Sequence, residues 1–98
     1  MVVPVTLAGS QTIREAADTA EILRAAVVQG DDLCIDCGGV DEADITFVQL
    51  VMAARKSLEA KGKTLTLAAK AEGAVLAALD AAGIKPSGSH QFWFEARP

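Results

Sequence analysis

Apolar residues recur every three or four positions over residues 45–61, and this spacing predicts a helix that packs one stripe on a core. The stripe consists of Phe47, Leu50, Val51, Ala54 and Leu58. Before the helix, Leu33 to Cys37 carries a single charge, which is typical of a central strand. We expect residues 40–44 to form an acidic loop between this strand and the helix.

The N-terminal third predicts a strand and then a helix. Residues 2–7 are rich in β-formers, with Pro4 favouring an edge position, and residues 8–10 read as a turn. Residues 11–13 allow a second short strand that forms a hairpin with the first. Alternatively, Thr12 and Glu15 form a capping box that starts a helix there, which then runs to Gln29.

After the central helix, residues 63–69 alternate Thr and Leu as a half-buried strand does, and residues 71–82 predict a third helix. Strands that alternate with helices in this way indicate right-handed crossovers and a largely parallel sheet. The predicted fold class is therefore α/β, with a sheet of about four strands and helices packed on it.

The C-terminal residues 86–98 are predicted to be an aromatic tail packed on a domain formed by residues 1–85. If Gln91 to Glu95 is extended, Phe92 and Phe94 share one face and Trp93 takes the other. One interpretation is an added edge strand or flap that closes the core with the two Phe rings. The other is an anchor for a partner, with Trp93 as its exposed element.

Composition and charge exclude several functions. The net charge is -4, whereas nucleic-acid binding requires a basic surface. No apolar run approaches the roughly 20 residues that span a bilayer, so membrane insertion is not expected. The start of the chain has no basic region followed by an apolar stretch, which predicts no signal peptide and a cytoplasmic location.

Cys34 and Cys37 form a C-x-x-C pattern, but strand geometry argues against a disulfide or a zinc site. Residues three apart in a strand point to opposite faces, with Cα atoms about 10 Å apart. There is no second Cys pair, and His90 is the sole histidine. We expect two buried, reduced thiols.

No constellation of catalytic residues is recognisable, and neither an enzyme nor a cofactor is predicted. The chain lacks a phosphate-binding loop, because Gly38-Gly39 has neither the spacing nor a following Lys-Ser/Thr. The carboxylates Asp41, Glu42 and Asp44 could in principle bind Mg²⁺, but clustered loop carboxylates are more often solvated. We therefore predict no metal site.

The segment around Thr46 resembles the STAS domains of anti-sigma factor antagonists and sulfate transporters. The resemblance covers about residues 1–85 and rests on a hydrophobic strand, an acidic loop, Asp-x-Thr, an apolar helix, Gly62 and a Thr/Leu strand. The motif of that family is usually Asp-Ser-Ser/Thr-Gly-Leu, matched here by residues 44–48. Ile45 replaces the first hydroxyl residue, and Phe47 replaces the glycine, where it would crowd the approach to the Thr46 hydroxyl.

The resemblance implies a non-catalytic regulatory module whose partner is an anti-sigma factor of the histidine-kinase-like ATPase type. Thr46 is then the candidate for phosphorylation. The expected partner-binding residues come from the loop and the start of the helix: Asp41, Glu42, Asp44, Ile45, Phe47 and Gln49.

Two alternatives stay open from the sequence. Either Thr46 caps the helix through a T-x-x-Q capping box with Gln49, or Asp44 is the cap and Thr46 lies in the first turn. The chain also resembles small STAS proteins that bind the ATPase of an ABC-type lipid transport complex as constitutive subunits. Ile45 and Phe47 favour such a packing role.

Overall fold

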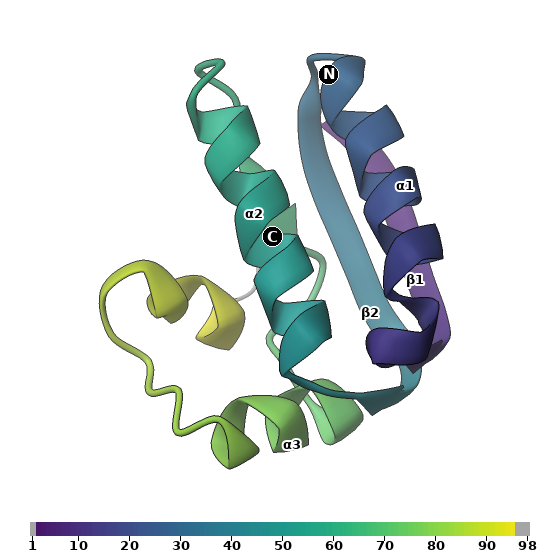
Figure 1. The fold of residues 1–98 in the computed structure, drawn as a ribbon. Helices are drawn as coiled ribbons and strands as arrows, with labels where there is room; N and C mark the ends of the chain where they lie inside the picture. The colour runs from purple at the N-terminus through teal and green to yellow at the C-terminus, as the bar shows by residue number, and fades with distance from the viewer. Residues whose placement is uncertain (1, 96–98) are drawn as a thin grey trace.

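The computed structural model describes residues 2–95, with the side chain of Ser89 excepted, and builds them around a three-stranded parallel sheet in the order β1-β2-β3 (Figure 1). The elements are β1 (Val2–Gln11), the 3-10 helix η1 (Ile13–Glu15), α1 (Ala16–Val28), β2 (Asp32–Ala43), α2 (Ile45–Glu59), β3 (Leu65–Leu67), α3 (Gly73–Ala81) and the 3-10 helix η2 (Gly88–Phe94). The α/β class is confirmed. The expected fourth strand is wrong.

The fourth strand is missing because the chain takes the helical alternative at Thr12. Residues 11–13 do not turn back on β1; the Thr12 hydroxyl accepts from the Arg14 N–H, and the Glu15 carboxylate accepts from the Thr12 N–H. This is the predicted capping box, and it starts η1 immediately after β1. Gln11 stays in β1, where its side chain is buried and accepts a hydrogen bond from Thr19.

The turn expected at residues 8–10 is strand, and so are residues 40–43 of the loop expected at residues 40–44. Ala8 pairs with Gly39 and Ser10 with Glu42, and two register shifts interrupt the pairing in this half. Gly39 permits the close approach, because a Cβ at that position would lie 3.0 Å from the Cβ of Ala8. The two strands together position the acidic residues that the sequence placed in a loop.

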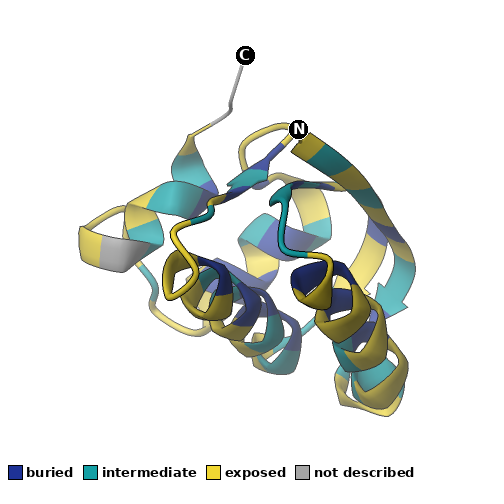
Figure 2. Ribbon diagram, turned by 90° about the horizontal axis from the view of Figure 1, so that it is seen from above, coloured by how far each residue is buried: buried dark blue, intermediate teal, exposed yellow. Residues whose placement is uncertain are grey.

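Both long helices cover the same face of the sheet, as successive right-handed crossovers in one direction require (Figures 1 and 2). The core between them is aliphatic apart from two rings: it includes Leu7, Leu33, Ile35, Val51, Leu58, Phe47 and Trp93. The opposite face of β1 exposes Pro4, Thr6 and Ala8. The sheet is therefore buried on one side.

The C-terminal tail folds differently from both interpretations of an extended segment. Residues 88–94 form η2, and Trp93 is buried with no exposed surface, whereas Phe92 and Phe94 are half-buried. A 3-10 helix has about three residues per turn, so neighbouring residues no longer alternate between two faces. Trp93 is therefore not the exposed element that the second interpretation required. Residues 96–98 of the predicted tail lie outside the described residues.

Cys34 and Cys37 are free thiols, each half-buried rather than buried as expected. Burial, and secondarily the charge of Asp36, raises the pKa of Cys37 to about 11. A thiol with a raised pKa holds little reactive thiolate near neutral pH.

We expect the melting temperature to be the same with and without dithiothreitol, because neither thiol is paired. We also expect iodoacetamide to alkylate Cys37 in the native protein at pH 8 at least tenfold more slowly than in urea, because the thiolate is the reactive form. Mass spectrometry of timed aliquots measures both rates. Equal rates would contradict the raised pKa.

No helix within residues 2–95 is long and apolar enough to cross a membrane.

Candidate partner-binding site

Asp44 joins the two segments that leave the carboxyl ends of β1 and β2. One carboxylate oxygen, Oδ1, accepts the Thr46 N–H at 3.0 Å and so caps α2. The other, Oδ2, accepts the Ile13 N–H at 3.0 Å, at the start of η1. A single side chain therefore fixes the start of α2 relative to η1.

The N-cap of α2 decides between the two alternatives that the sequence leaves open for Thr46. The capping box with Gln49 is wrong, because Asp44 is the N-cap and its carbonyl accepts the Phe47 N–H at 3.1 Å. Thr46 is the second residue of α2 and is half-buried. Its hydroxyl is thus in the first turn, beside the carboxylate that already occupies the helix N-terminus.

A second group of hydrogen bonds at this end of the sheet centres on the carboxylate of Glu15. Its Oε1 lies 2.7 Å from the Ser10 hydroxyl, 2.8 Å from the Thr12 hydroxyl and 3.0 Å from the Thr12 nitrogen. These hydrogen bonds, led by the one from Ser10, lower the pKa of Glu15 to about 2. The Ser10 hydroxyl also lies 3.1 Å from Glu42, so the network extends to the end of β2.

We expect the capping box to make the protein acid-sensitive. A carboxyl group whose pKa falls on folding adds stability above its unfolded value near 4.5, and that stability is lost as the pH falls toward 2. Glu15→Gln should lower the melting temperature at pH 7 and flatten its fall between pH 5 and 2, with Ser10→Ala giving a smaller change of the same kind. Thermal melts of the three proteins across this range test it. A Glu15→Gln profile parallel to that of the wild type would contradict it.

The structure brings most of the predicted site residues to one edge of the sheet. Asp41 and Glu42, at the end of β2, and Gln49, in the second turn of α2, are exposed. Ile45 is 42% exposed. Asp44 is half-buried because it is held between α2 and η1.

Phe47 is the exception among the predicted partner-binding residues. Its side chain is 1% exposed and packs in the core, with its ring centroid 6.4 Å from that of Trp93. It therefore offers no contact surface in this conformation, and it does not crowd the approach to Thr46 as expected. It supports the first turn of α2 from beneath.

The residues that sequence reasoning did not include are Ile13, Ser10 and Glu15. Ile13 is 70% exposed and shares Asp44 with α2, although 31 positions separate it from Asp44. The capping box was visible in the sequence, but its position beside the acidic residues follows from the parallel pairing of β1 with β2. The two exposed isoleucines, Ile13 and Ile45, flank the carboxylates. We call Ile13, Asp41, Glu42, Ile45, Thr46 and Gln49 the edge surface.

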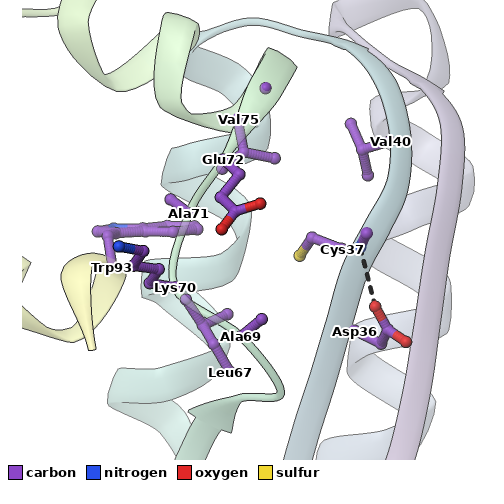
Figure 3. Close-up of a pocket in the computed structure, with 12 residues that line it drawn as sticks. Asp36, Cys37, Val40, Leu67, Ala69, Lys70, Ala71, Glu72, Val75 and Trp93 are labelled. Carbon is purple, nitrogen blue, oxygen red and sulfur yellow. Dashed lines mark hydrogen bonds between the residues drawn. The ribbon is translucent and has the colours of Figure 1, made fainter. Parts of the chain in front are cut away.

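Two carboxylates of this region, Asp44 and Glu15, accept backbone N–H groups at the starts of α2 and η1. Within residues 2–95, no group of three or more His, Cys, Asp or Glu side chains has the geometry to hold a metal ion. A separate cavity of about 240 Å³ lies between β2, the segment after β3 and the start of α3. Figure 3 shows Glu72 and Cys37 pointing toward it, with Asp36 tied back to the Gly38 N–H at 2.8 Å.

Comparison with protein families gives one match. The family model described as "Mlab, STAS domain" matches residues 2–86, which include all three strands and the edge surface. Neither the search of curated proteins nor the search of solved structures found a match.

Proposed function

Because the chain belongs to the STAS domain family, we propose that it is a non-catalytic regulatory module that binds a protein partner through the edge surface. STAS domains are generally non-catalytic and regulatory. The observation that carries the proposal is that Ile13 and Ile45 are both exposed beside Asp44, whose carboxylate accepts the N–H of Ile13 and that of Thr46. Exposed apolar surface rimmed by polar residues marks protein–protein interaction sites.

The partner that this family resemblance favours is an anti-sigma factor of the histidine-kinase-like ATPase type, and the candidate for control is Thr46. Phosphorylation would add about two negative charges to the first turn of α2. The Thr46 N–H is already bonded to the Asp44 carboxylate, so the phosphate would lie beside a negative charge at the start of α2. The free hydroxyl then corresponds to binding and the phosphorylated form to release.

A second candidate is a constitutive subunit of an ABC-type lipid transport complex, bound to the transporter ATPase. The exposure of Ile13 and Ile45 supports it, since permanent interfaces are more apolar than transient ones. The rigid support of α2 by the buried Phe47 also suits a surface that is not switched.

The test is an affinity capture from the native cell, with the full chain as bait. Ile45→Glu should reduce the captured partner at least tenfold, whereas it leaves folding intact because an acid is favourable in the first turn of a helix. Ile22→Glu on α1 is the matched control, since Ile22 is 49% exposed and lies outside the edge surface. Mass spectrometry then identifies either a soluble kinase-like ATPase or an ATP-binding cassette subunit.

Two results would overturn the proposal. Equal capture by Ile45→Glu and wild type would exclude the edge surface, and a loss with Ile22→Glu alone would move the interface to α1. Circular dichroism of each bait establishes that the comparison is between folded proteins.

A further inference from the structure

The C-terminal 3-10 helix η2 contains buried polar atoms that the rest of the described chain avoids. Within residues 2–95, the buried side-chain nitrogens and oxygens without a hydrogen-bond partner are His90 Nδ1 and Trp93 Nε1. Both belong to η2. A buried donor or acceptor without a partner is unfavourable relative to water. The seated position of η2 therefore carries a cost that departure from its seat would relieve.

The burial of Trp93, which has no exposed surface, opposes this cost. One backbone hydrogen bond also holds η2, from the Ala71 N–H to the Trp93 carbonyl at 2.7 Å. The Arg55 guanidinium of α2 lies 4.8 Å from the centroid of the Phe92 ring, which meets Trp93 edge-on at 5.2 Å within η2. Within residues 2–95 the ladders of the sheet join β1 to β2 and β2 to β3, so the departure of η2 breaks none of their hydrogen bonds.

Trp93 packs beneath the first turn of α2, which carries Ile45 and Thr46 of the edge surface. Trp93 has no exposed surface and lies against Phe47, which follows Thr46 directly in the first turn of α2. Trp93 also lines the cavity beside β2 (Figure 3). If Trp93 leaves, one side of Phe47 loses its packing, and the first turn of α2 loses the support that fixes Thr46 and Ile45.

We propose that η2 is a latch: seated, it holds the first turn of α2 in place through Trp93 and Phe47, and it leaves its seat without unfolding the sheet. By holding the first turn of α2, the latch would also set the affinity for the partner, and this consequence rests on the proposed function. The opening of the latch does not rest on it, because it is a property of the free protein. Trp93 is the positioning residue, and Arg55 reports on the seated state through Phe92.

Native-state hydrogen exchange of the full wild-type chain at low denaturant tests the opening. We expect amides of residues 88–95 and 47–51 to exchange through a shared partial opening with little denaturant dependence. Amides of residues 33–37 in β2 should exchange at least tenfold more slowly, with the denaturant dependence of global unfolding. The same rates and slopes in all three segments would overturn the latch.

A matched pair of variants tests the coupling. Arg55→Gln removes the contact with Phe92, whereas Glu59→Gln removes only the partner that lies 3.7 Å from Arg55. Arg55→Gln should raise exchange at residues 88–95 and 47–51 by the same factor, at least threefold, and should raise acrylamide quenching of Trp93, the sole tryptophan. Glu59→Gln should change neither. A rise confined to residues 88–95 would overturn the coupling.

The latch and the proposed function fail in different experiments. Unchanged exchange at residues 47–51 in Arg55→Gln rejects the latch, whatever the bait captures. Unchanged capture by Ile45→Glu rejects the edge surface as the interface, whatever the exchange rates show. If Arg55→Gln does not fold, Trp93→Phe, which keeps an aromatic ring without the unpartnered N–H, replaces it in the exchange measurement.

Discussion

Replacing Phe47 with Ala should lower the free energy of unfolding by about 3–5 kcal/mol, the usual cost of truncating a buried Phe. Phe47→Gly restores the residue of the family motif, yet it should lower the free energy by about 1 kcal/mol more, since Gly is unfavourable inside a helix. Such losses are a large part of the roughly 5–15 kcal/mol that stabilises a domain. The reason is the packing of Phe47 on Trp93 beneath α2.

Urea denaturation followed by circular dichroism measures this loss. Ile45→Ala is the control at the neighbouring position, where 42% of the residue is exposed, and it should change the free energy of unfolding far less. A double-mutant cycle of Phe47→Leu with Trp93→Leu should give a coupling energy of at least about 0.5 kcal/mol, because residues in contact are not additive. A loss below about 1 kcal/mol for Phe47→Ala would show that Phe47 does not belong to the core.

Replacing Thr46 with Glu should weaken partner binding more than tenfold while it leaves melting almost unchanged. The added charge is set into the partner interface, where an unpaired buried charge costs several kcal/mol, and about 1.4 kcal/mol is tenfold in affinity. Folding is little affected, because Asp44 and not Thr46 caps α2, and an acid in the first turn interacts favourably with the helix dipole.

Three variants separate the switch from the cap. Thr46→Val keeps the shape without the hydroxyl and should bind as the wild type does, whereas Asp44→Ala should lower the free energy of unfolding by about 0.5–2 kcal/mol. Affinity is measured by calorimetry with the captured partner, and stability by thermal melts. Thr46→Glu with wild-type affinity would leave Thr46 as an ordinary residue of the first turn.

The helices and the central strand were predictable because each has a strong local signal. The apolar stripe of α2, the capping box at Thr12 and the stop at Gly30 are all local, and Gly30 indeed has a positive φ of 80°. The family was predictable from the same segment. The extension of β2 through the acidic residues was not, since the paired residues of that half meet residues of β1 some 30 positions away.

The residues of the site also divide into those that the sequence alone groups and those that only tertiary contacts bring together. Asp44, Thr46 and Ile45 are adjacent in sequence, so their grouping needed no structure. The bond from the Ile13 N–H to Asp44 and the packing of Trp93 on Phe47 depend on tertiary contacts. Phe47 was misassigned to the surface because a match to a motif position says nothing about burial, although its membership of the apolar stripe of α2 did predict a core position.

The edge strand β1 bears on how the protein behaves in concentrated solution. From Val2 to Gln11 it carries no charged residue, and within residues 2–95 it has a sheet neighbour on one side, β2. Strands of this kind template the stacking of further chains into fibrils unless charge, proline or irregular register prevents it. Here Pro4 and the two register shifts must provide that protection. The irregular half of β1 that carries Ser10 to the edge surface therefore also keeps separate molecules apart.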